Sequence, residues 1–168
     1  MPKKEVKSLL DMQREVTPRV EGSVNPKDLL SLELLTSFKK YTKAMFMAQY
    51  HRSFIVAEHH EKMFSALQDV VDGKCKRLII NIAPRYGKTE LVIKSFISWC
   101  FALNPKCRFL HLSYSDILVN DNSDTIRSIM QEQLYTMLFP NSALNKEKGS
   151  AKRWKTKAGG ELYAVSTQ

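Results

Sequence analysis

The chain has 168 residues, of which 43% are hydrophobic and 26% charged, a balance typical of a globular protein with a sizeable core. No apolar stretch approaches the roughly 20 residues of a membrane-spanning helix, and no signal peptide is recognisable, so we expect a cytoplasmic protein without a membrane partner. The net charge of +9 favours a polyanionic partner, and the three cysteines, without a Cys-x-x-Cys pair, favour reduced thiols.

The N-terminal third of the sequence has helical patterning. Residues 1–24 mix charges without any period, which predicts a loosely ordered arm. Asn25-Pro26 has the form of an N-cap followed by proline, and predicts a helix that continues to about Met47. A second helix is expected over about 56–72, ended by Gly73. Residues 25–75 are therefore expected to form a helical lead-in.

The middle of the chain changes character. An apolar, β-branched run from about Arg77 to Ala83 predicts a buried strand, and a tight turn follows it. Gly87-Lys88-Thr89 then opens a helix that is expected to continue to about Leu103, where Asn104-Pro105 stops it. A strand, a turn and a helix that begins with Gly-Lys-Thr are typical of a phosphate-binding loop.

The C-terminal part predicts a second strand, a helix and a hairpin. Residues 108–112 are expected to form the strand, and the helix is expected from Ile117 or Asp121 to Met137. Alternation over 154–167, interrupted by two glycines, predicts a β-hairpin. Strand, loop, helix and strand form one right-handed βαβ unit of a parallel sheet, which makes the expected fold class α/β.

The chemistry of the loop follows from its residue types. Gly87 lets the backbone approach an anion closely, Lys88 can reach outer phosphates, and the Thr89 hydroxyl can ligate Mg²⁺. The N-terminal end of the following helix adds positive potential. The usual pattern is G-x-x-x-x-G-K-[ST], and Ile82 stands at the position of its first glycine.

The variant loop carries a family resemblance. Ala83 to Leu91, Ala-Pro-Arg-Tyr-Gly-Lys-Thr-Glu-Leu, resembles the deviant Walker A motif of tailed-phage terminase large subunits. Other blocks of that family recur in the same order and at similar spacing: Glu58-His59-His60, Val70 to Lys74, Leu112 to Ser115, Asn122 to Arg127, and Leu138-Phe139-Pro140. The resemblance covers about residues 50–165.

This resemblance implies a truncated P-loop NTPase core over residues 76–168, with ATP and Mg²⁺ as cofactors. The family packages viral DNA into capsids. Double-stranded DNA, a small subunit, the portal and sister motor subunits are its partners in a bacterial host cell. After residue 113 no apolar strand is followed by paired carboxylates, so the Walker B and nuclease residues are absent from this sequence. We therefore expect the N-terminal fragment of a packaging ATPase that binds nucleotide without useful turnover.

The resemblance also implies roles for individual residues. Arg85 would neutralise charge on the γ-phosphate, or it pairs with a carboxylate or a DNA phosphate instead. Lys88 is the second candidate catalytic residue. Adenine would be held by residues upstream of the loop, among them Gln49, Tyr50, Phe54, His59 and His60, although both histidines are also explained as helix-surface residues. The expected nucleotide-binding set is Pro84, Arg85, Tyr86, Gly87, Lys88, Thr89, Glu90 and His60.

A basic segment near the C-terminus supplies the candidate nucleic-acid residues Lys152, Arg153 and Lys155, with Trp154 among them. A basic stretch that contains an aromatic residue can follow a nucleic-acid backbone, and a solvated, lysine-rich hairpin explains the same pattern.

Three other functions stay open at this stage. The first is an inactive prophage remnant or a non-enzymatic module that binds nucleotide or DNA. The second is another P-loop ATPase, such as a helicase-like enzyme. The third is a small nucleotide kinase, although no lid segment is recognisable in the sequence.

Overall fold

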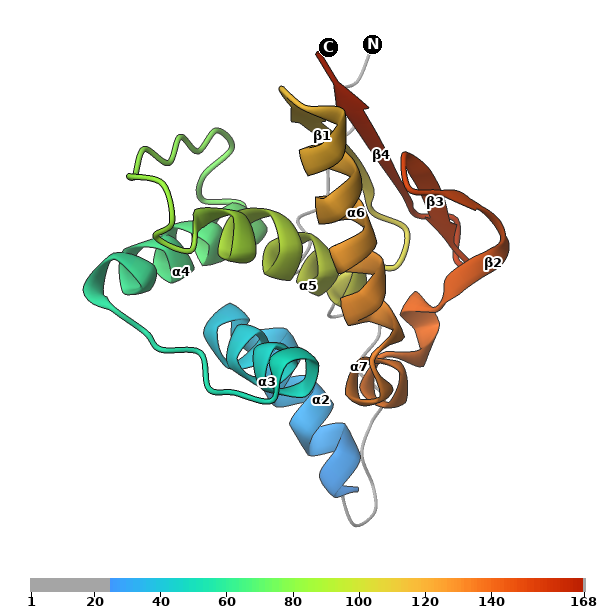
Figure 1. The fold of residues 1–168 in the computed structure, drawn as a ribbon. Coiled ribbons are helices and arrows are strands. Elements are labelled where there is room, and N and C mark those ends of the chain that lie inside the picture. The colour runs from blue at the N-terminus through green and yellow to red at the C-terminus, as the bar shows by residue number, and fades with distance from the viewer. Residues whose placement is uncertain (1–24, 168) are drawn as a thin grey trace, which may run out of the picture.

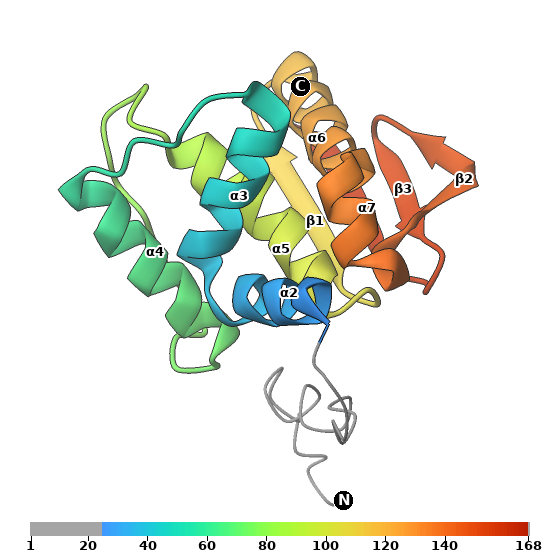
Figure 2. The same cartoon turned by 90° about the horizontal axis from the view of Figure 1, so that it is seen from below.

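A computed structural model describes residues 25–167, so the arm expected over residues 1–24 lies outside the described residues. The described chain has an α/β fold, with an N-terminal helical region and a mixed sheet of strand order β1-β4-β3-β2 (Figures 1 and 2). In this part of the chain, no helix is both long and apolar enough to cross a membrane.

The N-terminal region contains α2 (Pro26–Thr36), α3 (Phe38–Tyr50) and α4 (Glu58–Val71). Asn25 caps α2 as predicted, because its side chain accepts a hydrogen bond from the Lys27 N–H. The expectation of one helix to Met47 is wrong. Ser37 leaves the helical conformation, with φ −136° and ψ 106°, and its hydroxyl caps α3 instead.

A second group of helices follows the candidate loop. A π-helical segment η1 (Thr89–Ser95) continues directly into α5 (Phe96–Leu103). After the first strand come α6 (Asp116–Gln131), α7 (Gln133–Leu138) and the 3₁₀ turn η2 (Pro140–Ser142). The helix predicted to run unbroken to Met137 is therefore interrupted at Glu132, whose ψ of 142° is extended.

The strands are β1 (Arg108–Ser113), β2 (Leu144–Ser150), β3 (Arg153–Thr156) and β4 (Glu161–Ser166). β3 and β4 form the predicted antiparallel hairpin, with Gly159 in the turn at φ +94°. β4 also pairs in parallel with β1, at the edge of the sheet. The parallel partner of β1 is therefore β4, and α6 lies in the connection between them.

The strand predicted over Arg77 to Ala83 does not form. In both views the coil between α4 and α5 lies on the α4 side of the molecule, away from the strand arrows (Figures 1 and 2). Ile79 within it is 92% exposed. A strand needs a neighbour to satisfy its backbone, and within the described residues β1 pairs with β4 instead. The expected βαβ unit that begins before the loop is therefore wrong.

Aromatic side chains join the helices into one core. Phe38 and Trp99 pack with ring centroids 5.0 Å apart, and the Trp99 indole N–H donates to the Leu34 carbonyl at 2.9 Å. The Tyr41 hydroxyl donates to the Ser98 hydroxyl, and the Tyr135 hydroxyl donates to the Ser98 carbonyl. These bonds connect α2, α3, α5 and α7 across the buried interior.

The sheet has two different faces. On one face, which we call the covered face, Leu162, Ala164 and Trp154 are buried, and α6 packs against β4. The Trp154 indole N–H donates to the Ser123 hydroxyl of α6, and Phe101 of α5 packs on the indole ring. On the other face, which we call the open face, Leu110, Leu112 and Tyr163 are 63%, 59% and 48% exposed.

Candidate functional site

The loop from Ala83 to Thr89, here called the 83–89 loop, contains two backbone positions with positive φ. Arg85 has φ +67° and Gly87 has φ +75°, whereas Lys88 is helical at φ −52°. A positive-φ residue followed by a helical residue turns successive N–H groups toward one side, which makes a concave anion site. A non-glycine residue at positive φ is uncommon, so Arg85 is held in a sparsely populated conformation.

The helix after the loop completes this arrangement. The Leu91 N–H donates to the Gly87 carbonyl at 3.0 Å, so the helical hydrogen bonds begin at Gly87 itself. The N–H groups of a helix's first turn lack intrahelical acceptors and can face a ligand. The Phe96 N–H donates to the Leu91 carbonyl five residues earlier, the bond that defines a π-helix, and such turns are frequent at functional sites.

The polar side chains of the loop are accessible. Arg85, Lys88 and Thr89 are all exposed, so the charged groups predicted to contact phosphate are free to reach solvent. Lys88 and Thr89 also border a groove of about 410 Å³ whose other lining is mostly apolar, including Leu78, Ile80 and Phe109. The loop therefore lies at the polar end of an apolar groove between the coil and β1.

Glu90, which belongs to the predicted nucleotide-binding set, forms an ion pair. Its carboxylate pairs with the Lys94 ammonium at 3.1 Å, and both side chains are about one-fifth exposed. Tyr50 of α3 lies against this pair, and burial followed by the charge of Glu90 raises the pKa of Tyr50. The three side chains anchor the start of η1 to α3.

His60 also lies close to the loop, although α4 carries it. Its Nδ1 accepts a hydrogen bond from the Ala57 N–H at 3.0 Å, and its Nε2 lies 3.0 Å from the Nε2 of His59. The His59 ring in turn packs edge-on against Tyr86, with centroids 5.4 Å apart. Both ring nitrogens of His60 are thus engaged by the protein.

Two further adenine candidates, Tyr50 and Phe54, belong to an aromatic cluster. Phe54 packs edge-on against both Phe46 and His60, and Phe46 packs against Tyr50. Phe54 is only 9% exposed. Its ring is therefore part of the support behind the loop, and residue type and spacing alone do not distinguish this role from adenine contact.

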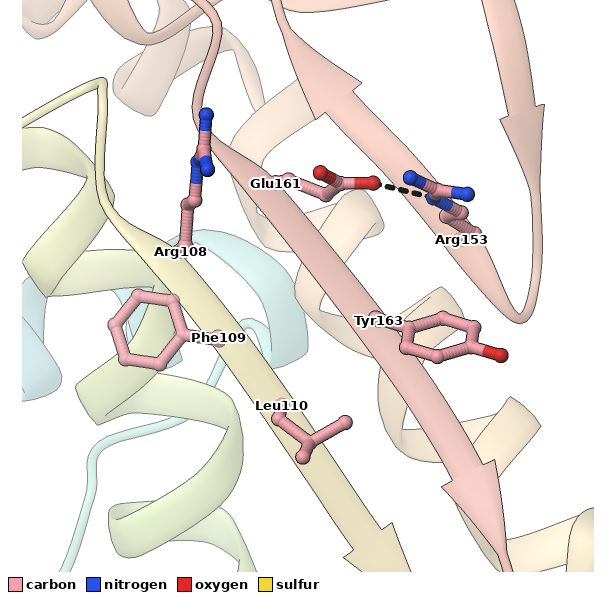
Figure 3. A pocket seen from close by; sticks show the side chains of 6 residues that line it. All are labelled: Arg108, Phe109, Leu110, Arg153, Glu161 and Tyr163. Atoms are coloured by element: carbon pink, nitrogen blue, oxygen red, sulfur yellow. Dashed lines mark hydrogen bonds and ion pairs between the residues drawn. The ribbon is translucent and has the colours of Figure 1, made fainter.

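Of the predicted nucleic-acid residues, Arg153 lies on the open face beside Glu161 and Tyr163 (Figure 3). Arg153 pairs with Glu161, and Lys152 pairs with Asp116 at 3.1 Å. The Arg153 guanidinium also lies 5.7 Å from the centre of the Tyr163 ring. Trp154 is 2% exposed on the covered face, so the expectation that its ring is available to a nucleic acid is wrong.

Side chains that could form a metal site are considered within residues 25–167. Among the residues that the structure describes, no group of three or more histidine, cysteine, aspartate or glutamate side chains could hold a metal ion. The Thr89 hydroxyl is the exposed oxygen of the loop that suits Mg²⁺, and phosphate oxygens would have to supply further ligands.

Comparisons with models of known families, with curated proteins and with solved structures find no match to this chain. The conformation of the 83–89 loop and the residues around it are therefore the observations that bear on function.

Proposed function

We propose that the 83–89 loop binds the phosphates of ATP together with Mg²⁺, and that the chain is the N-terminal part of a DNA-packaging motor ATPase of the terminase type. The observation that carries this proposal is the pair of positive-φ residues, Arg85 and Gly87, directly before a helix that begins with Lys88 and Thr89. Backbone N–H groups in such a turn converge on an anion, and the helix end adds favourable potential.

Each exposed side chain has a role in this proposal. Lys88 neutralises the outer phosphates, and the Thr89 hydroxyl ligates the magnesium ion that bridges them. Arg85, at the rim of the loop, is the group available to neutralise charge that develops on the γ-phosphate during transfer. Pro84 and Tyr86 shape the turn, and Glu90 anchors the helix through Lys94.

The proposal includes slow hydrolysis. Glu90, the carboxylate next to Thr89 in sequence, is already paired with Lys94 at 3.1 Å. A general base commonly contributes roughly 10²–10⁴-fold to a reaction of this kind. We therefore expect the chain to bind nucleotide with much less turnover than a complete motor.

Titration calorimetry with Mg·ATP tests the proposal. The Lys88→Ala variant should bind at least about 10-fold more weakly, a loss of about 1.4 kcal/mol. Lys43→Ala is the matched control, because it removes one exposed lysine from α3 and should leave the affinity unchanged. Equal affinities for the wild type and Lys88→Ala would contradict the proposal, and robust Lys88-dependent turnover would contradict the expectation of slow hydrolysis.

A further inference from the structure

His60 fills the space directly against the turn of the loop. A Cβ atom added at Gly87 would stand 2.8 Å from the His60 Nε2, and its next contacts would be other atoms of the same ring. The other side of the imidazole is closed by Phe54, with centroids 5.1 Å apart, and by His59, with centroids 3.9 Å apart. The ring is therefore wedged between an aromatic cluster and the loop backbone.

The hydrogen bonds of the ring define its protonation state. Because Nδ1 accepts from the Ala57 N–H at 3.0 Å, this nitrogen must carry a lone pair. The single proton of the neutral ring then lies on Nε2, which faces His59 Nε2 at 3.0 Å. A second proton would have to enter at Nδ1, where it would point at the Ala57 N–H. The hydrogen bond from Ala57 thus favours the neutral imidazole over the imidazolium.

The surroundings disfavour the charged ring in the same way. Burial, and next the neighbouring His59, lower the pKa of His60, while backbone hydrogen bonds with Tyr86 and Ile55 act in the opposite direction. The titratable side chains that pack around the ring are His59, from α4, and Tyr86, from the loop, whose own ring contacts His59. The Tyr86 residue therefore connects the loop to the histidine pair through both its backbone and its ring.

We propose that His60 is a positioning residue for the 83–89 loop, and that phosphate affinity depends on this imidazole being neutral. The ring supports the backbone at Tyr86 and Gly87 and holds the start of α4 through Ala57, without touching a ligand itself. This inference rests on the proposed function, because it concerns the affinity of the same loop.

The direction of the pH effect follows from linkage. Because the folded state lowers the pKa of His60, the stabilisation from the neutral ring is fully present above the unfolded value of about 6.5 and is lost as the pH falls below it. Loop affinity should fall over the same range, because protonation breaks the bond to Ala57 and places a charge beside His59.

Binding of Mg·ADP to the full chain at pH 7.5 and 5.5 tests this inference in wild type, His60→Gln and His60→Ala. Glutamine at this helical position can still accept from the Ala57 N–H, as in a capping box, but does not titrate. Wild type should lose more affinity than His60→Gln between the two pH values, by less than the roughly tenfold that an unshifted imidazole would give, and titration of ADP cancels in this ratio. The His60→Ala variant should bind Mg·ADP weakly at both pH values.

A second pair of variants tests the contact itself. Gly87→Ala should weaken binding strongly, since its Cβ meets His60 and its φ is positive. Adding His60→Ala removes the obstruction and should reduce the cost of Gly87→Ala severalfold, although the conformational cost remains. Parallel pH profiles for wild type and His60→Gln would overturn the role proposed for His60 and leave the proposed function standing. Strictly additive effects of Gly87→Ala and His60→Ala would have the same meaning. A folded wild type that binds no Mg·ADP at either pH would overturn the proposed function as well.

Discussion

The continuous helix from Thr89 to Leu103 joins two regions with opposite packing. Its C-terminal half is enclosed by other helices: Trp99 and Phe101 are fully buried, and Ser98 hydrogen-bonds to Tyr41 and Tyr135. Its N-terminal end is exposed at Lys88 and Thr89, and the preceding coil includes Ile79, which is 92% exposed. The same helix is therefore an interior element at one end and a surface site at the other.

This difference shows how the fold separates stability from chemistry. Aromatic contacts at the buried end fix the helix in place, and this helps to position the exposed end. His60, Phe54 and the Glu90–Lys94 pair supply the local support that the loop does have. Changes at the buried end should therefore alter the stability of the whole chain, whereas changes in the coil should not.

The largest predicted effect is at Trp99. Trp99→Ala removes a fully buried ring and a hydrogen bond to Leu34, and should cost about 3–5 kcal/mol in the free energy of unfolding. Ile79→Ala, in the exposed coil, should change that free energy by less than about 0.5 kcal/mol. Urea unfolding followed by circular dichroism measures both. A large loss in Ile79→Ala would show that the coil is packed and that the comparison is wrong.

The two faces of the sheet give the next largest difference. Leu162→Ala, on the covered face, should cost about 2–5 kcal/mol in the free energy of unfolding, because the side chain is completely buried. Leu110→Ala makes the same chemical change on the open face, where the side chain is 63% exposed, and should cost less than about 1 kcal/mol. Similar losses in the two variants would indicate that the open face is covered in solution.

The sequence predicted the helices well because their signals are local. Asn25 caps α2, Gly73 at φ +75° follows the end of α4, and Asn104 ends α5, each as expected from neighbouring residues. The breaks at Ser37 and Glu132 were missed, since the apolar spacing continues across both. In each case the long periodic segment was recognised and its continuity was overestimated.

The strands show where local signals are insufficient. The run from Leu78 to Ile82 has strong strand propensity, but a strand also needs a partner, which the residues themselves do not identify. The pairing of β1 with β4 joins segments far apart in the chain. At the candidate site, the motif located the loop, whereas the contact of His60 with Gly87 and the burial of Trp154 depend on tertiary packing.

Lys152, Arg153 and Lys155 are predicted to affect DNA affinity, and this effect is smaller than the effects on stability. Replacing Lys152, Arg153 and Lys155 with glutamine should lower the magnitude of the salt-dependence slope by up to about 2.7, if each contacts one phosphate of duplex DNA. Affinity at low salt should fall by roughly 30-fold on all sequences alike. Fluorescence anisotropy at several salt concentrations measures both quantities.

The control for this experiment makes the same change of charge elsewhere. Lys43, Lys62 and Lys106 are exposed on other elements, so their replacement with glutamine should reduce affinity less. Equal losses in the two triple variants would show that only net charge matters. In that case the basic hairpin would be a solvated surface, with Arg153 and Lys155 serving to pair with Glu161.

The smallest predicted effect concerns self-association of the chain through β1 and the open face of the sheet. β1 lies at the edge of the sheet, and its own side chains Leu110 and Leu112 are exposed on the open face. An unpaired strand edge with exposed apolar side chains favours edge-to-edge pairing between copies. Leu110→Glu with Leu112→Glu should raise the dissociation constant for self-association about 10-fold, or about 1.4 kcal/mol, in sedimentation velocity. Ile117→Glu, at an equally exposed position on α6, is the control. A wild type that stays monomeric at high concentration, with one sharp unfolding transition, would show that this sheet needs no further strands.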